Sequence, residues 1–507
     1  MRSIIIFIVS ICLTNISFIS TQDPIGLRVS ATLRDIRLGT AVLVDNLKNN
    51  VDSGKYISNI KKNYQWVVAE VGMKPKQIWL SENSYNWAVG DWLVGSPSNS
   101  IGWIQQNGLQ LRGHNLLWPG DNFMPPWLLQ QESTITPDKA KSLLQNYITT
   151  VVTRYRGKIA GWDVVNEAID DWDSSRPFNL RDSFWFRKLG RDFIKYAFIF
   201  AHNADPNVEL FYNDYSIERI SLKANRTLEL VNWLKSEGVT VHGIGMQWHI
   251  DVTKTVTPGD LYYQNAQRFI DQGYDILVTE LDISVPMRNG KPINPTDIEK
   301  QGALYRSLLQ YALHFHPKCH GLLTWGFTDR YSWLPAFSNN TKGDALPFDA
   351  AYLPKPAYWK MQEELARVLT DGTYCLSPQS QSNKCLGAAN DVASENVQLY
   401  DGACKTDNQK WNITWLGDGT YRLSPISINT RALSVFNVTT TVGGVQTTIW
   451  SNNINQEWVL TSTGNNVYRI GPRSAWLRVI AIVSGTQNIG IIDYTSSNEQ
   501  NWILTSI

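Results

Sequence analysis

The chain has 507 residues, enough for two or three domains that each bury a hydrophobic core. It carries 46 Lys+Arg and 45 Asp+Glu, a formal net charge of +1. This balance argues against nucleic acid as the main partner and gives no polybasic signal for a membrane surface. The unusual feature is 21 tryptophans, whose flat apolar faces suit either a large core or contact with sugar rings.

The N-terminus predicts a secreted protein. In Met1–Thr21, Arg2 precedes the apolar run Ile4–Leu13, and small polar residues follow, as in a secretory signal peptide. That run is too short to span a bilayer, and no later stretch is apolar and long enough to do so. We therefore expect an extracellular glycoprotein, with glycosylation sequons that begin at Asn225, Asn339, Asn412 and Asn437.

Residues 374–507 contain three copies of one pattern. Each copy opens with a Tyr-x-Leu/Ile-x-Pro sequence and closes with Gln-x-Trp, and the closing tryptophans are Trp411, Trp458 and Trp502. Repeats of about 45 residues with β-branched runs and turn residues predict three similar β units. The pattern resembles the ricin-type β-trefoil of lectins and of carbohydrate-binding modules of family 13. We expect the three tryptophans to be buried in the core rather than to bind sugar.

Residues 27–368 alternate short apolar strands with longer helical stretches. The amphipathic stretches 138–155, 184–203, 222–237 and 296–314 predict helices. Eight such β-then-α units predict a (β/α)8 barrel, and the alternative doubly wound sheet lacks a Gly-rich loop after its first strand. The expected strands are 36–44, 66–70, 109–116, 161–166, 209–212, 241–247, 276–280 and 321–325. The two domains are expected to meet around 369–373.

Polar residues and tryptophans gather at the predicted carboxyl ends of these strands, where barrel enzymes place their catalytic groups. Glu167 ends the fourth strand and Glu280 ends the seventh. Two carboxyl groups from different parts of a barrel rim can flank a glycosidic bond, one as proton donor and the other as nucleophile or base. The pattern therefore predicts a glycosidase.

The barrel resembles glycoside hydrolase family 10, the retaining endo-β-1,4-xylanases, over nearly all of residues 27–368. The motifs that carry the resemblance are Glu70-x-x-Met73-Lys74, Arg112-Gly-His114-x-x-x-Trp118, Trp162-Asp-Val-Val-Asn166-Glu167, Gly243-Ile-Gly-x-Gln247-x-His249, Thr279-Glu280-Leu-Asp282-Ile and Trp325-Gly-x-Thr-Asp329-x-x-Ser332-Trp333.

The resemblance implies a role for each matching residue. Glu167 would be the general acid/base and Glu280 the nucleophile, with carboxyl groups about 5–5.5 Å apart as retention requires. His249 and Asp282 would tune the nucleophile, and Asn166 would bind the 2-hydroxyl of the sugar being cleaved. The remaining substrate contacts would be Glu70, Lys74, His114, Trp118, Gln247, His249, Trp325 and Trp333. No metal and no organic cofactor is implied, and the expected partner of a monomeric enzyme is a polysaccharide.

The sequence departs from the family at the outer sugar subsites. Val71 stands where the family usually has Asn, Pro119 replaces a usual His, and Leu334 replaces a usual Arg, while 120–122 replaces a segment with a usual Gln. Each lost hydrogen bond is worth about 1 kcal/mol. Cleavage of a β-1,4-linked glycoside should persist, while the preferred glycan stays open. Alternatives are a retaining hydrolase of another β-linked glycoside and a non-catalytic carbohydrate-binding protein.

The C-terminal repeats also depart from their family. The positions of the usual sugar-binding Asp hold Gly387, Ser434 and Arg478. Aromatic residues that could still stack on sugar are Tyr400, Trp450 and Tyr494, so sugar binding and a purely structural role both stay open.

The cysteines that follow the signal have no CxxC pair and no nearby His pair, so disulfides are expected rather than a metal site. The resemblance to the trefoil modules implies a Cys385–Cys404 bridge. Cys319 either pairs with Cys375 or both are free.

Overall fold

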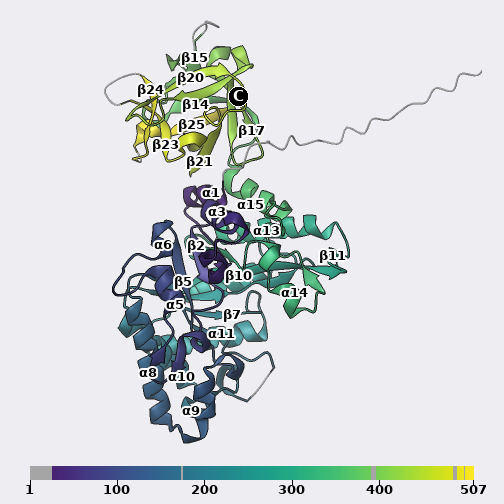
Figure 1. The fold of residues 1–507 in the computed structure, drawn as a ribbon. Helices are drawn as coiled ribbons and strands as arrows, with labels where there is room; N and C mark the ends of the chain where they lie inside the picture. The colour runs from purple at the N-terminus through teal and green to yellow at the C-terminus, as the bar shows by residue number, and fades with distance from the viewer. Residues whose placement is uncertain (1–25, 173–174, 390–395, 403, 484–487, 496) are drawn as a thin grey trace, which may run out of the picture. The chain divides into compact units, whose positions relative to one another are not determined.

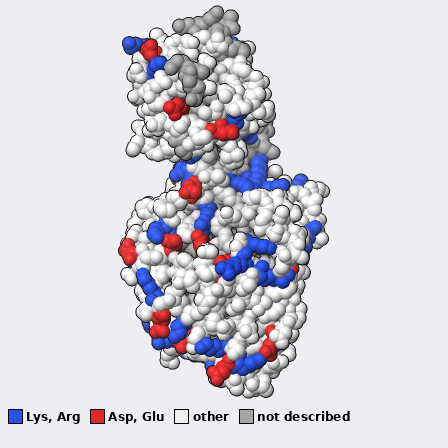
Figure 2. Space-filling model, turned by 90° about the vertical axis from the view of Figure 1, so that its left-hand side faces the viewer, with Lys and Arg blue, Asp and Glu red and all other residues white. Residues whose placement is uncertain are grey.

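A computed structural model describes residues 26–172, 175–389, 396–402, 404–483, 488–495 and 497–507. The expected signal peptide lies outside the described residues. These residues form two compact units, Gly26–Leu365 and Ala366–Ile507 (Figure 1). In the part of the chain that is described, no helix is long and apolar enough to cross a membrane. Basic and acidic side chains are interspersed on the face shown in Figure 2, consistent with the balanced charge.

The first unit contains a closed barrel of eight parallel strands, which confirms the predicted barrel architecture. Every neighbouring pair is parallel, and the last strand pairs with the first. Parallel strands are covered on both faces and therefore read as nearly continuous apolar runs. In order around the barrel the strands are β1 (Arg37–Val42), β2 (Trp66–Ala69), β5 (Gln110–Leu117), β6 (Gly161–Asn166), β7 (Glu209–Asp214), β8 (Gly243–Met246), β10 (Asp275–Arg288) and β12 (Cys319–Thr324).

Helices cover the outside of this barrel. One predicted helix, 184–203, is instead two, because Gly190 has a φ of 58° and ends the first of them in a conformation that suits glycine. The longer helices are α3 (Lys55–Asn63), α8 (Pro137–Arg154), α10 (Asp192–Ala204), α11 (Leu222–Ser236), α12 (Leu261–Asp271), α13 (Asp297–His314) and α15 (Pro356–Ala366). Shorter ones are α1 (Leu27–Leu33), α2 (Val44–Lys48), α4 (Pro75–Ile78), α5 (Ala88–Val94), α6 (Trp103–Gln106), α7 (Pro126–Gln130), α9 (Phe184–Leu189) and α14 (Leu334–Phe337).

Strand β10 is longer than the sequence predicts. Beyond the barrel it continues to Arg288 because three short strands pair with it: β9 (His249–Asp251), β11 (Lys291–Pro292) and β13 (Lys342–Gly343). The pairing with β9 sets His249 opposite Asp282. A separate hairpin joins β3 (Trp79–Ser81) to β4 (Ser84–Tyr85).

The second unit is all β. A closed barrel contains β14 (Gly372–Pro378), β17 (Lys410–Trp415), β18 (Tyr421–Pro425), β21 (Trp458–Gly464), β22 (Val467–Pro472) and β25 (Trp502–Ser506). Between successive barrel strands lie three hairpins: β15 (Lys384–Ala388) with β16 (Val397–Asp401), β19 (Arg431–Phe436) with β20 (Gly443–Ile449), and β23 (Arg478–Ile482) with β24 (Ile489–Asp493).

The three repeat tryptophans occupy equivalent places in this unit. Trp411, Trp458 and Trp502 are fully buried, and each indole donates to a backbone carbonyl of the hairpin in its own repeat, at 2.8–2.9 Å. This confirms the prediction that they belong to the core.

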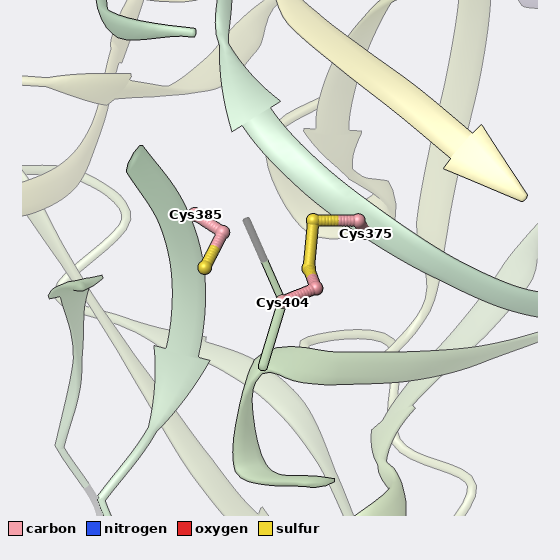
Figure 3. A group of neighbouring side chains, drawn as sticks. All are labelled: Cys375, Cys385 and Cys404. Carbon is pink, nitrogen blue, oxygen red and sulfur yellow. A yellow bond between two sulfur atoms is a disulfide. The ribbon is translucent and has the colours of Figure 1, made fainter. Parts of the chain in front are cut away.

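The predicted disulfide pairing is wrong. The bridge joins Cys375 to Cys404, while Cys385 and Cys319 are free and buried (Figure 3). Spacing alone does not decide the pairing, because the sulfur atoms of Cys375, Cys385 and Cys404 all lie within 4.8 Å of one another. The Cys385 thiol instead donates to the carbonyl of Gly402 at 3.2 Å.

Candidate active site

The residues singled out at the strand ends converge on one site. Glu167 follows β6, Glu280 and Asp282 lie in β10, and His249 opens β9. Hydrogen bonds join these side chains, and their partners lie in or directly after β5, β6, β7, β8, β9 and β10. The carboxyl ends of the barrel strands therefore bring together groups that are far apart in the sequence.

Glu280 is held as a carboxylate. It is 5% exposed, it accepts a hydrogen bond from Asn213 Nδ2 at 2.8 Å, and His249 Nε2 lies 3.3 Å from its Oε2. Burial alone would raise the pKa of Glu280, but the imidazoles of His114 and His249 hold it below its ordinary value.

His249 is itself kept charged. Its Nδ1 lies 2.8 Å from Asp282 Oδ2. Burial would lower the pKa of His249, yet the Asp282 carboxylate raises it well above its usual value. The contacts from Asp282 through His249 to Glu280 thus place a positive group beside the Glu280 carboxylate.

Glu167 has the opposite electrostatic setting. Burial, and then the nearby charge of Asp214, raise the pKa of Glu167 above its ordinary value. Its two carboxyl oxygens accept hydrogen bonds from Trp118 Nε1 at 3.0 Å and from Gln247 Nε2 at 2.9 Å. Glu167 is therefore suited to carry a proton while Glu280 is ionised.

The backbone of Glu167 is fixed in an uncommon conformation. Its φ of 55° lies in the left-handed region, which non-glycine residues seldom adopt. Its N–H donates to the carbonyl of Asn213 at 2.9 Å, and its carbonyl accepts from Arg181 Nε at 2.8 Å. Strain of this kind persists where surrounding contacts determine the conformation, as they do here.

Asn213, which our sequence reasoning did not select, connects the two carboxyl sites. Its Nδ2 donates to Asn166 Oδ1 and to Glu280 Oε1, both at 2.8 Å, and its Oδ1 accepts from Thr279 at 2.7 Å. Gly245 leaves room for it, because a Cβ there would lie 2.2 Å from Asn213 Oδ1. These contacts orient the Asn166 amide. Its buried Nδ2 has no hydrogen-bond partner within the described residues and is free to donate to a group that enters the site.

A buried ion pair supports the site from inside the barrel. Arg112 and Asp163 are paired at 1% exposure each, and His114 Nδ1 lies 2.9 Å from Asp163 Oδ2. Burial of Asp163 is overcome by Arg112 and His114, which hold the pKa of the carboxyl below its usual value. The pair orients His114, whose Nδ1 is 3.9 Å from Glu280 Oε1.

Tryptophans and one lysine surround the carboxyl groups. Lys74 Nζ lies 4.8 Å from the Trp118 ring and 5.8 Å from the Trp325 ring. Trp333 Nε1 donates to Asp282 Oδ2 at 2.9 Å. Burial is the main cause that lowers the pKa of Lys74 and that raises the pKa of Glu70 to about 7.

The positions that depart from the family resemblance lie in different surroundings. Val71 is 47% exposed beside Glu70. Leu334 is buried against Ala345, Leu346 and Trp333. The loop that begins with Pro119 carries Phe123, which stacks on one face of Trp118 and so covers a surface that the sequence left free for sugar.

The site contains two carboxyl groups whose pKa values are shifted in opposite directions, an oriented amide donor and flanking indoles. These features define the site of a glycoside hydrolase. The sequence model of glycosyl hydrolase family 10 matches residues 27–364. The chain belongs to this family.

Individual relatives agree with that assignment. Endo-1,4-beta-xylanase B of Thermotoga neapolitana is 32% identical over 356 residues, which are 70% of this chain and 96% of the relative. An endo-1,4-beta-xylanase of Agaricus bisporus is 32% identical over 324 residues, covering 63% and 86%. The crystal structure of xylanase 10B from Thermotoga petrophila in complex with xylobiose has a TM-score of 0.61 at 32% identity, covering 68% of this chain and 98% of that one.

The aromatic residues proposed for sugar contact in the C-terminal unit are partly engaged. The guanidinium of Arg422 lies 4.8 Å from the Trp450 ring, and that of Arg469 lies 4.5 Å from the Tyr494 ring. The Tyr400 hydroxyl donates to the carbonyl of Ala388 at 3.1 Å. Arg478, at one position of the usual sugar-binding Asp, donates to three backbone carbonyls.

Proposed function

We propose that this protein is a retaining endo-1,4-β-xylanase that cleaves internal bonds of xylan by double displacement. The observation that carries the proposal is the pair Glu167 and Glu280, both buried, with pKa values shifted in opposite directions and linked through Asn213, Asn166 and Gln247. An acid that keeps its proton and a carboxylate that stays ionised are what the first step requires.

In the first step Glu280 attacks the anomeric carbon while Glu167 gives its proton to the glycosidic oxygen, and the leaving sugar departs. In the second step Glu167, now a carboxylate, takes a proton from water, and that water displaces Glu280 from the sugar. Two inversions retain the configuration. His249 and Asp282 stabilise the carboxylate of Glu280 when it is released.

Binding of the sugar chain rests on groups around the carboxyls. The free Nδ2 of Asn166 is a donor for a sugar hydroxyl, and Lys74 and Glu70 offer further polar contacts. Indoles of Trp325 and Trp333 provide flat apolar surface beside His249.

The test is turnover of xylan by Glu280→Ala and Glu167→Gln, with Glu299→Gln on the exposed surface of α13 as a control. Both site variants should lose nearly all activity while thermal unfolding stays cooperative. Activity like that of the unchanged protein in either variant would contradict the proposal. Parallel assays on cellulose and on aryl β-glycosides decide between xylan and another β-linked glycoside, a question raised by the exposed Val71.

We infer further that the C-terminal unit is a ricin-type β-trefoil. The support is a closed six-stranded barrel, three hairpins and three equivalent buried tryptophans, one set per repeat. Its role in sugar binding is tested by retention of the isolated protein on insoluble xylan with Trp450→Ala and Tyr494→Ala. Unchanged retention would favour a purely structural role.

We also propose that the protein is secreted. Its N-terminal sequence has the pattern of a signal peptide, it contains a disulfide, and the sequons at Asn339, Asn412 and Asn437 lie on exposed residues. Expression in a eukaryotic secretory host should give a protein in the medium whose mass falls on treatment with an endoglycosidase. Retention inside the cells would contradict this.

A further inference from the structure

Two tryptophans that contact the catalytic groups each pack against a phenylalanine. Phe123 lies on Trp118 with ring centroids 3.6 Å apart and planes at 8°. Phe337 packs on Trp333 at 4.7 Å and 48°. Trp118 donates a hydrogen bond to Glu167, and Trp333 donates one to Asp282. A single indole therefore separates Phe123 from Glu167, and a single indole separates Phe337 from Asp282.

The loop that carries Phe123 is anchored at several points. The Asp121 carboxylate accepts from the backbone N–H of Phe184 at 2.9 Å and from Arg187 at 2.8 Å. The carbonyl of Asn122 accepts from Lys76 Nζ at 3.1 Å. Polar contacts to α9 and to Lys76 therefore hold the loop that places Phe123 on Trp118. Phe123 remains 39% exposed.

Phe337 is positioned by the short helix α14. Its N–H donates to the carbonyl of Trp333 at 3.1 Å, and Leu334 one turn earlier is buried against Ala345 and Leu346. The buried leucine anchors the start of the helix, and Phe337, its last residue, is 73% exposed. Most of the Phe337 side chain is thus unburied in the free protein, although its ring contacts the indole of Trp333.

We propose that Phe123 and Phe337 are specificity-determining residues that bind the apolar faces of xylose units outside the sugars at the cleaved bond. The proposal rests on the xylanase function argued above. Pyranose rings present C–H groups on their faces, and an aromatic ring offers these groups a flat apolar surface. Phenylalanine makes no hydrogen bond, so these contacts respond to the length of the sugar chain and the shape of its rings. The two phenylalanines would thus extend the site outward from Trp118 and Trp333.

The proposal predicts a dependence on chain length. In Phe123→Ala and Phe337→Ala, kcat/KM on xylohexaose should fall about five- to tenfold relative to kcat/KM on an aryl β-xylobioside. Phe436→Ala is the matched control, because Phe436 is 42% exposed in the C-terminal unit and packs against Gly444 there. The control should leave the ratio of the two substrates within twofold of that of the unchanged protein.

Binding is measured separately from turnover. Calorimetric titration of xylohexaose into Glu280→Ala, with and without each Phe→Ala change, should show dissociation constants weakened by about the same factor. Equal losses on both substrates would place the rings at the inner sugars and overturn the proposal, as would unchanged binding and an unchanged ratio. Absence of xylan turnover in the unchanged protein would instead contradict the proposed function, and the calorimetric comparison would still decide the role of the two rings.

Discussion

Lys223 Nζ lies 2.9 Å from the carboxylate of Asp214. Asp214 is completely buried, and it is the charged group that contributes most to raising the pKa of Glu167. Its carboxylate also accepts from the Tyr212 hydroxyl at 2.6 Å. After burial, which is the largest cause, the charge of Asp214 therefore adds to the raised pKa of Glu167, and the charge of Lys223 opposes it.

Asp214→Asn should move the alkaline limb of the pH–activity profile to lower pH. Activity requires protonated Glu167, and removal of a neighbouring negative charge lowers the pKa of Glu167, so its proton is lost earlier as the pH rises. The measurement is kcat/KM on an aryl β-xylobioside across the pH range. Asp182→Asn, at an exposed carboxylate paired with Arg187, serves as the control. An alkaline limb that stays in place or moves upward would refute this role for Asp214.

His249→Asn should move the acid limb of the pH–activity profile to higher pH. Loss of the charged imidazole raises the pKa of Glu280, so the nucleophile becomes protonated at a higher pH and the acid limb shifts upward. Because the imidazole also stabilises the departing carboxylate, kcat should fall by at least ~10². A pH profile with an unmoved acid limb would show that His249 affects only packing.

Asn213→Ala tests the link between the two carboxyl sites. The change removes the donor to Glu280 and frees the Asn166 amide, so we expect a loss of about 10²-fold in kcat/KM, with most of it in kcat. Asn265→Ala provides a comparison, since that buried amide donates to the backbone of Ile217 away from the site. If stability falls equally in both variants, kcat should still distinguish them. Equal kcat values would contradict the role given to Asn213.

The disulfide assignment predicts unequal effects of cysteine replacement. Cys404→Ser opens a loop with a sequence separation of 29, which costs about 3–4 kcal/mol in the chain-entropy account. Cys385→Ser should leave the bridge intact and change stability by less than about 1 kcal/mol. Peptide mapping under non-reducing conditions identifies the bridge directly. A linked peptide that contains Cys385 and Cys404 would mean that the structure has the wrong pairing.

Much of the barrel follows from sequence because its strands are buried on both faces and read as apolar runs. Glu167 and Glu280 were identifiable because each follows such a run within a recognisable motif. Asn213 was not, since the predicted strand stopped at Tyr212. Its importance arises from strand register: it lies opposite Asn166 on the neighbouring strand. Which residues face each other on neighbouring strands depends on how the strands align around the barrel. The local sequence pattern of one strand does not specify that alignment.

The cysteine pairing and the stack on Trp118 illustrate a different limit. Three sulfurs share one small volume, so the bridge is decided by side-chain geometry rather than by distance along the chain. Phe123 covers Trp118 because the loop after Pro119 is held by contacts to α9 and to Lys76, all distant in sequence. Composition alone left a large core and sugar contact as equal explanations of the 21 tryptophans. The structure buries nine of them: Trp66, Trp79, Trp162, Trp185, Trp248, Trp325, Trp411, Trp458 and Trp502.

Double displacement requires that Glu280 form a covalent bond to the sugar. The direct test is mass spectrometry of the protein after incubation with an activated 2-deoxy-2-fluoro-xylobioside, which slows release of the intermediate. We expect a mass increase of one 2-deoxy-2-fluoro-xylobiosyl group on the peptide that contains Glu280, and no increase in Glu280→Ala. A label on a different residue, or turnover of the reagent without any label, would contradict it.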